Sequence, residues 1–196
     1  KVEDSIFPVE VKNIPSPTIE DSQSSAVSND RPSLSELYNE LNHAVLYITA
    51  EKMEGGVQGS GFIITKSGIG ISNYHVFKGS NVSSVNIYVD KARYFVERVL
   101  AYNESQDYII FQIKGGGRSF PFLKIANSIP EIGEDVFAIG NPKGIEKTLS
   151  KGVVSQRHSL QGIIQTTAEI THGSSGGPLF NMKGEVVGIT SAGLNE

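Results

Sequence analysis

No cysteine occurs in this sequence of 196 residues. Disulfide bonds and thiolate metal sites are therefore excluded, and the composition does not reveal the redox compartment. The sequence also lacks an excess of positive charge, since 17 Lys and Arg face 21 Asp and Glu for a net charge of −4. A nucleic-acid partner is not expected from this balance. No apolar run approaches the roughly 20 residues that a membrane-spanning helix needs, so no membrane span is expected.

What is present indicates a globular chain rich in uncharged polar residues. Hydrophobic residues make up 38% and charged residues 19%, which excludes a wholly disordered chain, and 21 glycines favour turns. The length suits one domain with a sizeable core, or two small barrels that share an interface.

The first 32 residues differ in composition from the rest. They hold four of the eight prolines and a polar run over residues 20–30, which predicts an extended arm or linker. The chain begins at Lys1 rather than Met. We therefore expect a processed N-terminus, and a signal peptide could have been the part removed.

After the arm, the pattern predicts one short helix followed by many short strands. Ser33 and Glu36 fit a capping box, and Leu34, Leu37, Tyr38 and Leu41 follow at the spacing of one helical face. Runs of β-branched and aromatic residues then alternate with turn residues, which favours antiparallel barrels or a sandwich over βαβ units. The predicted strands lie at residues 45–48, 61–65, 85–89, 108–113, 135–139, 152–155, 162–165 and 185–189.

The sharpest chemical signal is a serine in a glycine-dense turn, residues 173–178 (GSSGGP). Glycine allows positive φ and a close approach of substrate to the backbone. In such a turn of Gly173, Ser174 and Ser175, the N–H groups of Gly173 and Ser175 can converge on one point. They would then stabilise the negative oxygen of a tetrahedral intermediate, as a backbone oxyanion hole does.

Chain order separates two interpretations of this serine. Residues 173–177 also satisfy the G-x-S-x-G pattern of α/β-hydrolases, but those enzymes place an acid and then a histidine after the serine. Beyond Ser175 this chain has neither Asp nor His. A chymotrypsin-like enzyme needs His, Asp and Ser in that order, and the chain supplies all three.

His75 is the best candidate for the base, because it ends a strand pattern beside a turn, where an imidazole can face a cleft. His172 is too close to Ser175 in sequence to serve as the base, although it could line the substrate cleft. His43 and His158 are interpreted as surface or structural residues.

A carboxylate must hold the imidazole of the base in the right tautomer. Asp107 stands at the head of a strongly apolar run, where its burial would make sense. Asp90 follows a predicted strand and precedes Lys91, so it is interpreted as a solvated turn residue.

With these residues in view, the sequence resembles the HtrA/Deg branch of trypsin-like serine proteases. The motifs that carry the resemblance follow one another in order over about residues 44–193: GSGFII (59–64), SNYHV (72–76), DYIIF (107–111), AIGNP (138–142), SKGVVS (150–155), QTTA (165–168) and GSSGGPL (173–179).

This resemblance implies an all-β fold of two antiparallel β-barrels of the chymotrypsin type with one short N-terminal helix. Residues 33–122 would hold the helix and the first barrel, with His75 and Asp107. Residues 123–196 would form the second barrel, with Ser175.

Three features depart from the family. Ser174 stands where the family usually has Asn, a small polar exchange, and the family's PDZ domain is absent from this chain. The chain also stops at Glu196, before the last barrel strand and terminal helix that the resemblance implies. Since an open barrel exposes unpaired strand edges, we expect that the natural polypeptide is longer or that a partner supplies the strand.

The resemblance also assigns residues to substrate binding. Glu169 and Ile170 would form the wall and base of the primary specificity pocket, with His172 lining the cleft. Ile170 favours a small aliphatic side chain before the scissile bond, whereas an inward, ionised Glu169 would favour Lys or Arg. The aliphatic alternative is preferred, because a buried unpaired carboxylate is costly. The edge that pairs with substrate backbone would comprise Thr190, Ser191, Ala192 and Gly193.

The expected function is that of a serine endopeptidase acting on unfolded or misfolded proteins, with no metal or organic cofactor. The alternative is a catalytically latent or inactive homologue that binds peptides in a chaperone-like manner. The resemblance further implies a polypeptide substrate as partner, a homo-trimer, and an extracytoplasmic location in the periplasm or cell envelope, with the cytoplasm left open.

Overall fold

The computed structural model describes residues 32–53, 55–141 and 147–192. The chain divides into two units, residues 1–30 and residues 31–196. The extended arm expected over residues 1–32 lies, apart from Pro32, outside the described residues. In the part of the chain that the structure describes, no helix is long and apolar enough to cross a membrane.

The predicted capping box begins helix α1 (Leu34–Leu41). The amide of Ser33 donates to the Glu36 carboxylate at 2.8 Å, and the amide of Glu36 donates to Ser33 Oγ at 3.2 Å. The Ser33 hydroxyl, which donates to the Glu36 carboxylate at 2.7 Å, and then the Ser33 amide lower the pKa of Glu36, so the cap is strongest with the carboxylate ionised. Leu37 is buried, and the chain continues through a 3-10 turn, η1 (Asn42–Ala44), into the first strand.

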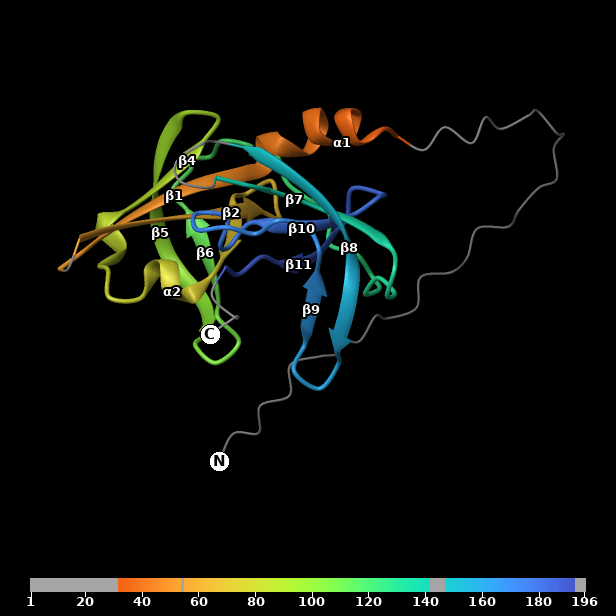
Figure 1. Cartoon of the computed structure of the whole chain (residues 1–196). Helices are drawn as coiled ribbons and strands as arrows, with labels where there is room; N and C mark the ends of the chain where they lie inside the picture. The colour runs from red at the N-terminus through yellow and green to blue at the C-terminus, as the bar shows by residue number, and fades with distance from the viewer. Residues whose placement is uncertain (1–31, 54, 142–146, 193–196) are drawn as a thin grey trace, which may run out of the picture. The chain divides into compact units, whose positions relative to one another are not determined.

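The first six strands form a closed antiparallel barrel in the order β1-β2-β3-β6-β5-β4 (Figure 1). Alternate side chains of β4 and β6 are buried, as the period of two along a strand requires. A short helix, α2, and a 3-10 turn, η2, lie between β3 and β4. The bounds are β1 (Val45–Lys52), β2 (Gly55–Ile63), β3 (Ile69–Ser72), α2 (Tyr74–Phe77), η2 (Val82–Ser84), β4 (Val85–Val89), β5 (Ala92–Asn103) and β6 (Tyr108–Ile113).

The last five strands form a second antiparallel sheet in the order β11-β10-β7-β8-β9 (Figure 1). Within the described residues this sheet is not closed, in contrast to the first barrel. The segment that connects β6 to β7 is tied to both halves, because the Leu123 amide donates to Ile63 O and the Ala126 amide to Val186 O. The bounds are β7 (Asp135–Gly140), β8 (Thr148–His158), β9 (Ile163–Thr166), β10 (Pro178–Asn181) and β11 (Val186–Ile189).

One apolar cluster joins the two halves of residues 31–196. It includes Val45 and Phe62 from the first barrel and Phe137 and Phe180 from the second sheet, together with Leu37 of α1. The rings of Phe137 and Phe180 stack with their centroids 4.9 Å apart, and both side chains are fully buried. Each half also has a cluster of its own. The shared cluster is the packing that sets the first barrel against the second sheet.

Candidate active site

His75 lies on the one-turn helix α2, directly after β3 ends at Ser72. Its side chain is 45% exposed, as expected for an imidazole at a cleft. The flanking Val76 and Phe77 are buried in the first barrel. Their packing anchors α2, so that the imidazole is exposed on a rigid support.

Asp107 stands at the turn before β6 with φ of 52°, in the left-handed region that a non-glycine residue rarely adopts. Its carbonyl oxygen accepts hydrogen bonds from Asn73 Nδ2 at 2.8 Å and from the Tyr74 amide at 3.3 Å. These two bonds hold the strained turn against the start of α2. Strain of this kind persists where surrounding structure fixes it, and it is common at functional sites.

Two hydrogen bonds join Asp107 to His75. The His75 amide donates to Asp107 Oδ1 at 2.8 Å, and His75 Nδ1 lies 2.7 Å from Asp107 Oδ2. Because an ionised carboxylate only accepts, Nδ1 carries a proton in this pair and the lone pair of neutral imidazole is on Nε2. The pair that the sequence predicted is therefore brought together in a geometry that suits a general base.

Ser175 lies in the segment 171–177, here called the nucleophile loop, and is 6% exposed. The loop packs tightly against β2 and the end of β3. A Cβ added to Gly176 would stand 2.2 Å from Ser60 O and 2.3 Å from Ser72 Oγ, and φ at this glycine is +90°. Both the space and the backbone conformation therefore require glycine directly after Ser175.

The amides of the nucleophile loop fall into two groups. The Ser174 amide donates to Thr171 O at 2.9 Å, and the Gly177 amide donates to Ser174 O at 3.0 Å. Among the described residues, no acceptor is found for the amides of Gly173 and Ser175. Of the predicted group of Gly173, Ser174 and Ser175, only the first and last thus have an N–H available to a substrate oxygen.

The hydroxyl of Ser175 accepts a hydrogen bond from the Ala192 amide at 3.1 Å. Within the described part of the chain, no hydrogen bond joins Ser175 Oγ to His75 Nε2. The bond from Ala192 occupies one lone pair of the oxygen and leaves the hydroxyl hydrogen free. The structure therefore joins His75 with Asp107, and it places Ser175 without a direct bond to that pair.

The residues assigned to the specificity pocket differ in burial. Glu169 is exposed, whereas Ile170 is half-buried and packs against the cluster of Val136, Ala138, Val154 and Leu179. His172 is exposed in the nucleophile loop. Of these three residues, only Ile170 lies in an apolar environment, which is the kind that could favour an aliphatic substrate side chain.

The edge expected over residues 190–193 is partly occupied. The Thr190 amide donates to Gly177 O and its carbonyl accepts from the Gly176 amide, each at 2.8 Å. Thr190 is therefore paired with the nucleophile loop and its N–H is not free for substrate, contrary to its expected role. Ser191 and Ala192 are half-buried, and Gly193 lies outside the described residues.

One lysine contacts the main chain of His75. Lys52 Nζ donates to His75 O at 2.9 Å. Burial, together with the nearby charge of Lys78, lowers the pKa of Lys52. Lys78 in turn forms an ion pair with Glu104, which raises the pKa of the lysine. Among the described residues no group of three or more His, Asp or Glu side chains is arranged to hold a metal ion.

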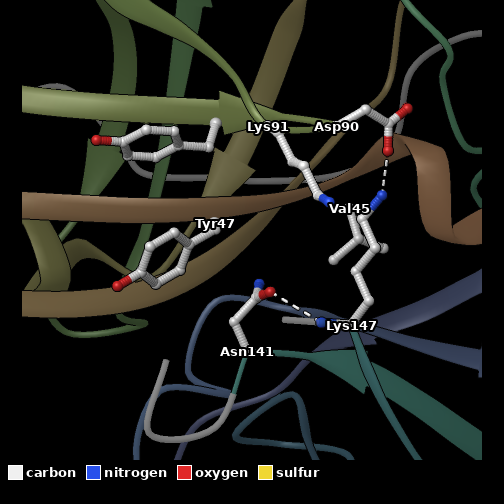
Figure 2. Close-up of a pocket in the computed structure, with 7 residues that line it drawn as sticks. Val45, Tyr47, Asp90, Lys91, Asn141 and Lys147 are labelled. Atoms are coloured by element: carbon white, nitrogen blue, oxygen red, sulfur yellow. Dashed lines mark hydrogen bonds and ion pairs between the residues drawn. The ribbon is translucent and has the colours of Figure 1, made fainter. Parts of the chain in front are cut away.

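A second polar cluster lies around Asp90, at the turn between β4 and β5 (Figure 2). The Asp90 carboxylate pairs with Lys147 and with His43 Nδ1, the latter at 2.9 Å. Burial alone would raise the pKa of Asp90, but the hydrogen bonds and charges of Lys147 and His43 outweigh it and lower the pKa. Asp90 does lie in a turn, but it is a paired residue rather than the freely solvated one that was expected.

Comparison with known proteins places the chain in a family. The model described as a trypsin-like peptidase domain matches residues 59–189. The chain therefore belongs to the trypsin-like peptidase family, and its relatives are HtrA/Deg serine proteases. The resemblance seen in the sequence motifs is confirmed.

Individual relatives support the same assignment. A Synechocystis sp. protein named as the serine protease HhoA is 37% identical over 146 residues, which are 69% of this chain and 36% of that protein. A Chlamydia muridarum protein named as a DegP-like periplasmic serine endoprotease is 32% identical over 144 residues, covering 69% of this chain and 28% of that protein. The chain thus spans about a third of the length of these relatives.

A solved structure confirms the chymotrypsin-type fold. The crystal structure of the serine endoprotease from Yersinia pestis matches with a TM-score of 0.71 and 26% sequence identity, over 81% of this chain and 57% of that one. The closed first barrel and the second sheet described above therefore match the fold of solved serine endoproteases, among them Deg5.

The pairing of Asp90 predicts a specific acid dependence of stability. Since the folded-state pKa is lowered, the contribution of Asp90 is fully present above the unfolded pKa, about 3.9. It is lost as the pH falls from there through the folded-state pKa. Asp90→Asn should lower the free energy of unfolding by about 1 kcal/mol or less at pH 5, because the carboxylate is nearly half exposed. By pH 3 the difference from wild type should have shrunk.

Urea denaturation at pH 5 and pH 3 measures this difference. Asp135→Asn is the matched control, since it removes the carboxylate of an exposed pair with Lys151 and should change the free energy of unfolding by less than about 0.5 kcal/mol. A wild-type advantage over Asp90→Asn that grows on acidification would contradict the assignment.

Proposed function

We propose that this chain is a serine endopeptidase in which Ser175 attacks the peptide carbonyl, His75 takes and returns the proton, and Asp107 orients His75. The observation that carries the proposal is the double hydrogen bond between His75 and Asp107, at 2.8 and 2.7 Å. It keeps Nε2 as the basic nitrogen. Membership of the trypsin-like peptidase family supports the same roles.

The oxyanion of the tetrahedral intermediate would be bound by the amides of Gly173 and Ser175. Support comes from the main chain of the nucleophile loop, where these two amides lack an acceptor among the described residues and the Ser174 amide is already used by Thr171 O. Preorganised N–H donors of this kind stabilise the charge that develops in the transition state.

The substrate would be an unfolded or misfolded polypeptide, taken up in an extended conformation. Proteins named as DegP-like periplasmic endoproteases are among the relatives, which supports a polypeptide substrate and an extracytoplasmic location. Assembly into a trimer is proposed from the same resemblance, and light scattering on the purified protein tests it directly.

A latent form of the same enzyme is the second candidate. It is favoured by one observation, namely that Ser175 Oγ accepts from the Ala192 amide and has no hydrogen bond to His75 within the described residues. In apo enzymes such bonds are often made only in the substrate complex. A lag in hydrolysis that shortens after preincubation with a substrate peptide would favour this candidate over a constantly active enzyme.

Replacing the carboxylate of Asp107 tests the proposed mechanism. In Asp107→Asn the side-chain amide that replaces the carboxylate no longer fixes the proton on His75 Nδ1. The kcat should therefore fall by about 10³ to 10⁴-fold. Release of fluorescent peptides from a labelled unfolded polypeptide, compared with the same polypeptide when folded, measures the activity. Asp135→Asn controls for loss of an exposed carboxylate and should keep wild-type activity. An Asp107→Asn protein that retained a tenth or more of the wild-type kcat would refute the role of Asp107.

The environment of Ile170 predicts the primary specificity. We expect cleavage after Val, Ala or Ile to exceed cleavage after Lys or Arg by at least about tenfold, because a hydrophobic pocket discriminates by one to three kcal/mol. A peptide library varied at the residue before the scissile bond gives the ratio. Glu169→Gln should leave the ratio within about twofold, since Glu169 is exposed. A preference for basic residues that Glu169→Gln abolishes would overturn the aliphatic assignment.

A further inference from the structure

We propose that two buried hydroxyl groups, those of Ser60 on β2 and Thr190 after β11, are positioning residues for the nucleophile loop. Each donates its hydrogen to a carbonyl oxygen of the loop, Ser60 to Gly173 O and Thr190 to Ser174 O. The Thr190 contact holds the peptide unit that carries the Ser175 N–H, and the Ser60 contact holds the unit that adjoins the Gly173 N–H. The inference rests on the proposed function, since it concerns how that site is prepared.

The direction of the Ser60 hydroxyl is fixed by its neighbours. Ser60 is fully buried, and its Oγ lies 2.9 Å from the Asn141 amide, 3.1 Å from Asn141 Nδ2 and 2.8 Å from Gly173 O. The two N–H groups of Asn141 occupy both lone pairs of the oxygen. The single hydroxyl hydrogen therefore has one acceptor left, which is the carbonyl of Gly173.

Asn141 itself is held from two sides and is 1% exposed. Its Nδ2 also donates to Leu46 O at 2.9 Å, and its Oδ1 accepts from the Lys147 amide at 3.0 Å. Figure 2 shows Lys147 continuing from this contact to the carboxylate of Asp90. The Ser60 hydroxyl that donates to Gly173 O thus belongs to a polar network whose hydrogen bonds fix the direction of its O–H bond.

Thr190 provides the second support. Its side chain is 5% exposed and donates from Oγ1 to Ser174 O at 2.6 Å, while Gly177 O lies farther away at 3.2 Å. The main chain of Thr190 is fixed by Gly176 and Gly177, as described above. The hydroxyl therefore has both a set position and a preferred acceptor.

The planarity of the peptide bond transmits these contacts to the oxyanion donors. Ser174 C=O and Ser175 N–H belong to one trans peptide unit and point in opposite directions. Holding Ser174 O towards Thr190 therefore directs the Ser175 amide to the opposite side.

Ser60 holds the preceding peptide unit, which meets the Gly173 amide at the Gly173 Cα but does not contain it. Ser60 holds Gly173 O and Thr171 O accepts from the Ser174 amide, so the unit between Gly173 and Ser174 is fixed at both ends. Gly173 has φ of 95°, a conformation that glycine can also leave at little cost. Without an external hold, the adjoining Gly173 amide would sample other directions.

Removing either hydroxyl should lower kcat and leave KM nearly unchanged, because oxyanion donors act in the transition state rather than in substrate binding. We expect Ser60→Ala and the isosteric Thr190→Val each to lower kcat by about tenfold to a hundredfold. This decrease is no larger than that expected from losing one oxyanion donor outright. KM should change by less than about twofold. Thr190→Ser keeps the hydroxyl and should restore kcat to within about threefold of wild type.

Ser72→Ala is the matched control for Ser60→Ala. Ser72 is equally buried, lies on the neighbouring strand β3, and donates to Ser60 O at 2.7 Å instead of to the nucleophile loop. Its loss removes one buried hydrogen bond and should leave kcat within about twofold of wild type. An equal fall in kcat for Ser72→Ala and Ser60→Ala, or a wild-type kcat in Thr190→Val, would overturn the proposal.

Amide hydrogen exchange separates this inference from the proposed function. In a Ser175→Ala background, which removes the proposed nucleophile, Ser60→Ala should speed exchange of the Ser174 amide by at least about tenfold relative to Ser72→Ala. This readout needs no hydrolysis. Failure of the wild-type chain to cleave any polypeptide would reject the endopeptidase, whereas unchanged exchange in the nucleophile loop would reject the positioning role. If Ser60→Ala does not fold, the pair Thr190→Val and Thr190→Ser decides by kcat and by exchange of the Gly177 amide, which donates to the same Ser174 O.

Discussion

The hydrogen bond from the Ser60 amide to Ser175 O, at 2.8 Å, is the contact on which the whole site depends. It joins the first barrel, which holds His75 and Asp107, to the loop that holds Ser175. Glycine at positions 59 and 176 permits this approach, since a Cβ at Gly59 would stand 2.7 Å from Val76 and one at Gly176 would stand 2.2 Å from Ser60 O. Close packing of backbone on backbone, supported by the shared apolar cluster, is therefore what assembles the site.

Much of the fold could be predicted from local sequence patterns. The capping box gave the start of α1, and the alternating runs gave β4 and β6 with their observed bounds. Strand β5 was missed because most of its side chains are exposed and two register shifts in its pairing with β6 break the period of two. Strand β10 was missed because it begins at Pro178, inside a glycine-rich motif typical of a turn.

The candidate site was predictable only where residues occur in motifs. The order of His75, Asp107 and Ser175, together with the glycines around the serine, carried the assignment of the triad. Ser60 and Asn141 also lie in quoted motifs, but their contacts with the nucleophile loop and with each other span 113 and 81 residues. No spacing rule encodes such contacts, since they depend on how the second sheet docks on the first barrel. The pairing of Asp90 with Lys147 was missed for the same reason.

Activation of Ser175 by His75 is the central claim, and covalent labelling tests it most directly. The folded protein would be treated with a fluorophosphonate, and the modified residue would be mapped by mass spectrometry alongside Ser175→Ala and His75→Ala proteins. A serine becomes reactive towards such a reagent only when a neighbouring base activates it. Modification confined to Ser175, and strongly slowed in His75→Ala, is the predicted result. Absence of modification in a well-folded sample, or equal labelling of Ser175 with and without His75, would contradict the claim.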